Sequence, residues 1–122
     1  MPLVTVTAPT HPAQYRLLSA VADAVAQALA LGDGDVLATW VAASAVVASG
    51  ASPERRAPEG SAPDAAPAGA WPIVSLHGGD RGPVAVDAAC AAAEQAVRDW
   101  AHRNAIELEG VWTEWLTPRP PR

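Results

Sequence analysis

The sequence has few sulfur-containing residues and few aromatic residues other than tryptophan. The scarcity of cysteine in particular limits which kinds of site the protein can have. Its 122 residues contain no phenylalanine, one tyrosine, one methionine and one cysteine. A single cysteine cannot form an internal disulfide, so we expect Cys90 to be a small buried hydrophobic residue of a helix. The three histidines are dispersed and show no ligand spacing with Cys90, so we expect no metal.

Positive charge is also scarce in this chain. The formal net charge is −5, from eight basic and thirteen acidic residues. No basic stripe is available to bind phosphates, which argues against nucleic acid as a partner. No uninterrupted apolar run reaches the about 18 residues of a membrane span, and residues 1–12 do not resemble a signal peptide. We therefore expect a soluble cytoplasmic domain with no membrane partner.

Alanine, valine and five tryptophans make up much of what the sequence does contain. A chain of this length is expected to form one domain, residues 1–122, and to bury only somewhat more than about 60% of its unfolded surface. Alanine-rich helices bury little area each. We therefore expect further burial against another copy of the chain.

The first half, residues 1–48, is predicted to form a βαβ unit. Residues 3–8, LVTVTA, alternate β-branched and smaller side chains and predict a strand. Residues 13–31 predict a helix, which Gly32 is expected to end in the left-handed conformation. Residues 36–47 predict the second strand. The apolar face of the helix is expected to comprise Leu18, Val21, Val25 and Leu29.

The second half, residues 71–117, repeats this order. The stretch WPIVSLHG predicts a strand, residues 83–104 a helix, and EGVWTEWLTP a last strand before a frayed tail over residues 118–122. Pro83 suits the first helical turn. The apolar face of this helix is expected to comprise Val86, Cys90, Ala93, Val97 and Trp100.

The two halves correspond in detail and are separated by different material. MPLVTV matches WPIVSL, and GDVLATW matches EGVWTEW. Residues 49–70 are rich in proline, alanine, glycine and serine without an apolar period, which predicts a flexible loop. Each helix must cross over to a parallel strand. The predicted fold class is therefore α/β, β-α-β-β-α-β, with a four-stranded mixed sheet and two helices on one face.

The start MPLV, combined with this length and duplication, resembles the tautomerase superfamily. Short members such as 4-oxalocrotonate tautomerase are single βαβ units. Long members, such as macrophage migration inhibitory factor and malonate semialdehyde decarboxylase, are two fused units. The resemblance covers nearly all of the chain except residues 49–70 and the tail. It implies a cofactor-independent enzyme, a homotrimer as the long members are, and a small keto/enol substrate that can carry a carboxylate.

The resemblance also implies a catalytic role for Pro2. Removal of Met1 is expected because the next residue is small, and it leaves Pro2 as a secondary amine at the terminus. Burial and nearby cations disfavour a protonated amine and so lower its pKa toward neutrality. Such a base can take a proton from one atom and return it to another. The alternative is that Pro2, like its mid-chain counterpart Pro72, only begins a strand.

Substrate-binding residues follow less directly from the resemblance. The short members carry an arginine at the eleventh residue counted from the proline, which falls beside Arg81 in the second half and beside His11 in the first. Arg81 is the expected anion-binding residue, and Arg16 could reach the same site. His11 could assist proton transfer. Gly79 could offer its backbone N–H to an oxyanion.

The last predicted strand adds two further candidates and one departure from the family. The short members carry an arginine on the second strand, where this chain has Leu37 and its counterpart Trp112, so the site is expected to be more apolar. Trp112 could line the site, and Glu114 could activate a water. Three hypotheses follow: a tautomerase; a hydratase, dehalogenase or decarboxylase of a small unsaturated or β-keto acid; or a non-catalytic binding or assembly module.

Overall fold

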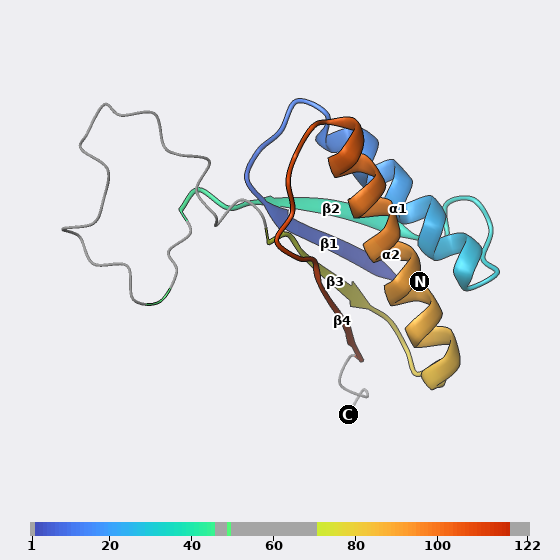
Figure 1. The fold of residues 1–122 in the computed structure, drawn as a ribbon. Coiled ribbons are helices and arrows are strands. Elements are labelled where there is room, and N and C mark those ends of the chain that lie inside the picture. The colour runs from blue at the N-terminus through green and yellow to red at the C-terminus, as the bar shows by residue number, and fades with distance from the viewer. Residues whose placement is uncertain (1, 46–48, 50–70, 118–122) are drawn as a thin grey trace, which may run out of the picture.

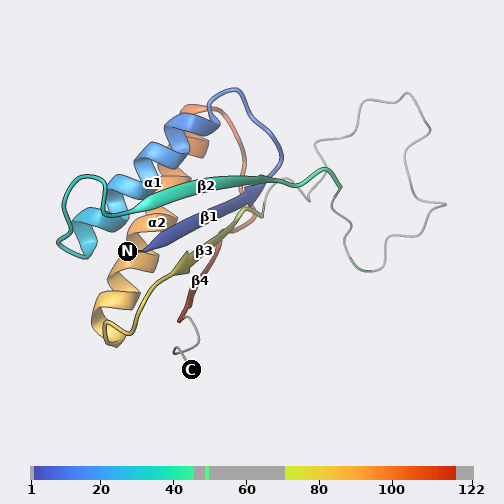
Figure 2. The same ribbon diagram turned by 180° about the vertical axis from the view of Figure 1, so that it is seen from behind.

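A computed structural model describes residues 2–45, 49 and 71–117, and these contain four strands and two helices. The strands form one mixed sheet in the order β2-β1-β3-β4, and both helices cover the same face (Figures 1 and 2). The predicted β-α-β-β-α-β fold is therefore confirmed. The elements are β1 (Leu3–Ala8), α1 (Gln14–Ala28), β2 (Leu37–Ala42), β3 (Ile73–His77), α2 (Pro83–Arg103) and β4 (Trp112–Leu116).

Some expectations concern residues outside the described ranges. These are the loss of Met1, the last residues of the strand predicted over 36–47, the loop over most of 49–70 and the tail 118–122. Within the described residues, the second strand ends at Ala42.

The sheet has an internal twofold pattern. β1 pairs in parallel with β2, β3 pairs in parallel with β4, and the two central strands β1 and β3 run antiparallel. The carbonyl oxygen of Pro2 accepts a hydrogen bond from the N–H of Leu37 at 3.1 Å. The carbonyl of Pro72 accepts the equivalent bond from Trp112 at 3.0 Å. MPLV and WPIV are therefore equivalent strand starts.

The helix-covered face of the sheet forms the core. Val4 and Val6 of β1 and Val74 and Leu76 of β3 are fully buried against the helices. These β-branched and leucine side chains alternate with residues of the opposite face, as the strand period of two requires. The helices contribute the buried side chains of Leu17, Val21, Val25, Ala89, Ala93, Val97, Trp100 and Ala101.

The predicted helix faces need two corrections. Leu17 is buried, whereas Leu18 and Leu29, which were expected in the core, are half-buried beside it. On α2, Val86 and Cys90 are half-buried, while alanines face inward. The small alanines let α2 lie close to α1, so the core-facing stripe is displaced toward the other helix. Neither of the two helices in the described residues is long and apolar enough to cross a membrane.

The left-handed residue that ends α1 is Ala30 rather than Gly32. Ala30 has φ 55°, and the N–H of Leu31 donates to the carbonyl of Ala26 at 2.8 Å. α2 ends in the same way at Ala105, which has φ 54°. This is the Schellman arrangement, which satisfies the last free carbonyls of a helix.

Neither α1 nor α2 covers the opposite face of the sheet (Figure 2). Its side chains form three rows across the strands, which follow from the register of the pairs. The central row is polar and the outer rows are largely apolar, with several large side chains exposed. We call this surface the open face. Its rows are Leu37, Leu3, His77 and Leu116; Thr39, Thr5, Ser75 and Glu114; and Val41, Thr7, Ile73 and Trp112.

Candidate active site

Pro2 is fully buried and lies where β1 begins, on the helix-covered side of the sheet. Its carbonyl oxygen accepts a hydrogen bond from the N–H of Leu37, and this bond holds Pro2 at the end of the sheet. Leu3 pairs with His77 in the antiparallel ladder. Antiparallel partners advance in opposite directions, so Gly78 lies opposite Pro2. The chain end that carries Pro2 is therefore held beside the turn that follows β3.

That turn contains two of the predicted substrate-binding residues. Gly79 and Arg81 are both exposed in it, a few residues from the Gly78 that faces Pro2. The carboxylate of Asp80 accepts a hydrogen bond from the N–H of Gly82 at 2.9 Å. Gly82 has φ 81°, a left-handed conformation that glycine adopts without strain, and α2 starts at the next residue. The structure therefore brings Pro2, Gly79 and Arg81 to the same end of the sheet.

Arg81 is the predicted cation at this end. It forms no ion pair with another of the described residues, among which Arg98 and Glu94 are paired. Its charge is therefore not neutralised by a carboxylate of the described residues.

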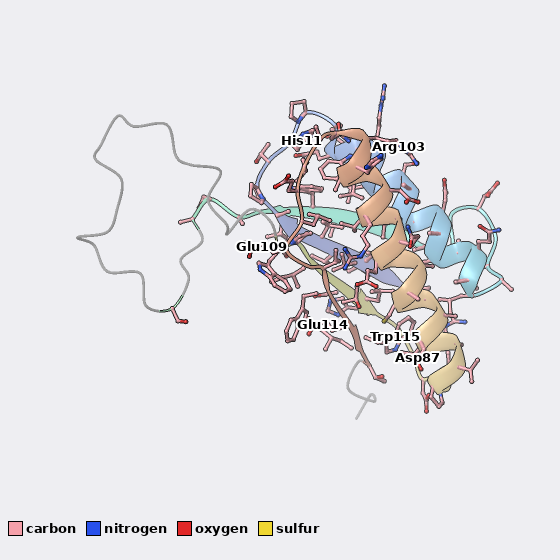
Figure 3. All side chains as sticks on the ribbon, viewed as in Figure 1. His11, Asp87, Arg103, Glu109, Glu114 and Trp115 are labelled. Carbon is pink, nitrogen blue, oxygen red and sulfur yellow. The ribbon has the colours of Figure 1, made fainter. Side chains whose placement is uncertain are left out.

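Trp115 forms one wall next to this turn. Leu76 lies between Val4 and Trp115 in a row across the helix-covered side. The indole of Trp115 extends from this row over Gly78: a Cβ built on Gly78 would lie 2.7 Å from its Cζ2 atom. The ring therefore occupies the space of a side chain at 78, in the row that contains Pro2. Figure 3 shows Trp115 at the same end of the molecule as Asp87 of α2.

His11 and Arg16 lie at the other end of the sheet within one chain. Both follow the carboxyl end of β1, whereas Pro2 precedes its amino end (Figure 3, where His11 is labelled). His11 has a structural role there. Its Nδ1 accepts a hydrogen bond from the N–H of Ala13 at 2.9 Å, and its ring packs edge-on against Trp100 at 4.9 Å.

Trp112 and Glu114 lie on the open face, away from Pro2. They occupy the same face of β4 as expected from their spacing, Trp112 largely exposed and Glu114 half-buried in the central polar row. The hydroxyl of Ser75 donates to Glu114 at 2.8 Å. Within one chain, therefore, neither residue shares a side of the sheet with Pro2.

A groove of about 610 Å³ runs between α1 and α2. Alanines line much of it, and Arg16, Trp100 and Arg103 stand toward one end. Pro2 and its neighbouring turn are not among the lining residues, so this groove is distinct from the candidate active site. Its rim carries charges of both signs, including Asp23 and Asp99.

Cys90 is a free cysteine and is half-buried on α2. Burial, followed by the negative charge of Asp87, raises the pKa of the Cys90 thiol above its ordinary value. The thiolate that would act as a nucleophile is therefore disfavoured near neutral pH.

Sequence reasoning did not place Trp115 beside the turn that follows β3. The signal lay in Gly78, because a glycine directly after a buried strand allows close approach of a neighbouring group. The partner of that glycine is separated from it by the whole of α2, and only the fold brings the two together.

Comparison with known proteins defines this fold further. No family model matches the sequence, and no curated protein matches it either. Solved structures do match. A fused 4-OT that forms a symmetric trimer has a TM-score of 0.61 and 22% identity, with 98% of this chain and 85% of that chain covered.

Two other matches are described as different proteins. A malonate semialdehyde decarboxylase, described as having decarboxylase and hydratase activities, has a TM-score of 0.60 and 15% identity over 95% of this chain and 84% of that chain. Macrophage migration inhibitory factor of Toxoplasma gondii has a TM-score of 0.58 and 17% identity over 97% of this chain and 90% of that chain. These proteins are tautomerase superfamily members, so the predicted resemblance to that superfamily is confirmed at the level of the fold.

Proposed function

We propose that this chain is a cofactor-independent tautomerase in which Pro2, freed by removal of Met1, is the general acid and base. The observation that carries the proposal is the place of Pro2. It is buried at the start of β1, opposite a glycine turn that presents Arg81. Pro72 has the equivalent backbone contact in the second half but is in mid-chain and cannot be an amine base.

The proposed reaction moves one proton between two atoms of a small keto/enol compound. The Pro2 nitrogen takes the proton of an enol hydroxyl, and the resulting ammonium returns a proton to the neighbouring carbon. An enclosed apolar environment favours the neutral amine, which is the form that accepts the first proton. Val4 and Leu76 supply that environment at the end of the core nearest Pro2.

The turn after β3 would bind the anionic part of the substrate. Arg81 would pair with a carboxylate, and the N–H of Gly79 would face an oxygen that gains negative charge. A side chain at Gly79 would meet no atom within 4 Å, so the backbone there is open to a ligand.

The remaining predicted site residues require a second copy of the chain. Arg16, His11, Trp112 and Glu114 lie away from Pro2 within one chain. We propose a homotrimer in which the open face packs against other copies, which could bring some of these residues to a neighbouring Pro2. Two pairs of exposed neighbours on the open face, Leu3 with Leu37 and Ile73 with Trp112, support this assembly, since exposed apolar patches mark interaction sites. A fused 4-OT of the same fold is a trimer.

The direct test replaces each of the two equivalent prolines. Ketonisation of phenylenolpyruvate by Pro2→Ala should fall at least about 100-fold below that of the natural protein, the usual contribution of a general acid–base group. Pro72→Ala is the matched control and should retain activity. Mass spectrometry of the natural protein should show that Met1 is absent. Equal activity of Pro2→Ala, or retention of Met1 in the active protein, would remove Pro2 as the base.

A second candidate function is hydration, dehalogenation or decarboxylation of a small unsaturated or β-keto acid. The malonate semialdehyde decarboxylase of the same fold favours it, because that protein has both decarboxylase and hydratase activities. Glu114, with the hydroxyl of Ser75 bonded to it, would then activate a water from a neighbouring copy. Product analysis with malonate semialdehyde separates this activity from a tautomerase. Inactivity of the protein toward both substrate classes would favour a binding or assembly module.

A further inference from the structure

Two tryptophans at equivalent places in the two halves carry buried indole N–H groups without an acceptor. They are Trp40 on β2 and Trp115 on β4, and neither Nε1 atom has a partner among the described residues. The indoles of Trp71 and Trp100, in contrast, donate to Glu109 at 2.8 Å and to the carbonyl of Ala13 at 3.0 Å. Buried donors are nearly always paired in proteins, so an unpaired one requires an explanation.

The surroundings of the two indoles differ in one respect. Trp40 packs against Trp100, with ring centroids 6.4 Å apart. Trp115 instead lies over Gly78, with ring carbons where a side chain would stand. The position equivalent to Gly78 in the first half is Ala8, which carries a methyl group where Gly78 has only hydrogen. Only the second half has a glycine at this position. Only there, therefore, can an indole enter the row of side chains that contains a proline at the start of a strand.

We propose that Trp115 is a substrate-binding residue whose indole N–H donates to the keto or enol oxygen of a small 2-keto acid held at Pro2. The proposal rests on the proposed function of Pro2. The oxygen gains negative charge as the amine takes its proton, so a donor already in place stabilises the charged state most. Indole is only a donor and does not transfer a proton itself.

The division of roles also defines the class of substrate. Arg81 is the positively charged residue of the turn after β3 and suits the carboxylate of a 2-keto acid. The neutral indole N–H is then left for the adjacent keto or enol oxygen. The flat face of Trp115 adds an apolar wall, which favours an aryl or other apolar substituent over a second carboxylate. Trp40 is the equivalent tryptophan near Pro72. Because Pro72 is in mid-chain and has no free amine, the indole N–H of Trp40 has no catalytic role in this proposal.

The first experiment observes the N–H directly in the natural protein labelled with ¹⁵N. Phenylglyoxylate serves as the probe because it is a 2-keto acid without an α-hydrogen and cannot enolise. Indole resonances are assigned by triple-resonance spectra, so no tryptophan needs to be replaced. The Trp115 indole proton should shift downfield and saturate, while the Trp40 resonance should move little. A Trp115 resonance that does not respond to a probe that binds would overturn the proposal.

The second experiment separates this inference from the role of Pro2. Trp115→Phe keeps a ring and removes the donor, and kcat/KM for phenylenolpyruvate should fall about tenfold, as expected for a hydrogen bond to a group that gains charge. Trp40→Phe is the matched control and should remain within about twofold. If Pro2→Ala is inactive but Trp115→Phe has full activity, the inference fails and the proposed function stands. If Pro2→Ala is fully active, the proposed function fails, and the shift of the Trp115 resonance still decides whether this indole binds the keto acid.

Discussion

The indole of Trp71 lies directly on Gly110, with its Nε1 donating to the neighbouring Glu109 at 2.8 Å. Gly110 is buried, and a Cβ built there would overlap carbon atoms of the Trp71 ring. The contact joins the segment before β3 to the segment before β4, so both parallel strands of the second half begin at a fixed place.

Replacement of Gly110 by alanine should therefore destabilise the protein. The added methyl group must displace the Trp71 ring, and overpacking of this kind costs about 1–3 kcal/mol. Chemical denaturation should show a lower free energy of unfolding for Gly110→Ala. Gly79→Ala is the control, because no atom lies within 4 Å of a Cβ there, and its stability should change by less than about 0.5 kcal/mol. Equal stabilities of the two variants would contradict the tight contact.

Glycine at the ends of the two helices should stabilise the protein. Ala30 and Ala105 are exposed and hold φ near 55°, where a Cβ is unfavourable and glycine is not. Ala30→Gly and Ala105→Gly should each raise the free energy of unfolding by about 0.5–1 kcal/mol. The control Ala91→Gly lies at an exposed site inside α2 and should lower it by about 1 kcal/mol. A loss of stability in all three variants would indicate that neither helix ends in this conformation.

A charge on the open face should disrupt assembly. Leu37 is 53% exposed in an apolar row of the open face, and a buried carboxylate at a subunit contact would have no partner. Light scattering coupled to gel filtration should show an oligomer for the natural protein and a smaller species for Leu37→Glu. Val84→Glu is the control, since Val84 is 84% exposed on α2, and its oligomer should persist. An unchanged oligomer in Leu37→Glu would exclude this face as the contact.

Much of the fold could be predicted because it depends on local periodicity. Alternating apolar residues in LVTVTA and PIVSL define strands whatever their partners are. Helical spacing likewise defines the buried faces: Val21 and Val25 on α1, and Ala93, Val97 and Trp100 on α2. The sequence-based predictions were wrong for individual residues whose burial or conformation depends on contacts with a neighbouring element. Leu17 rather than Leu18 is buried because α1 is rotated toward α2. Ala30 rather than Gly32 ends α1 because the helix stops earlier than its apolar pattern.

The sequence by itself determined the duplicated βαβ order and the equivalence of Pro2 and Pro72, because each depends on residues close together in the chain. The tertiary structure alone decided which residues surround Pro2. Arg81 and Gly79 reach its end of the sheet, while His11, Arg16, Trp112 and Glu114 do not within one chain. Trp115 and Gly78 meet only because β3 and β4 pair in parallel, which places their side chains in neighbouring rows on one face. Strand register is set by packing across the whole sheet, and a single stretch of sequence does not contain it.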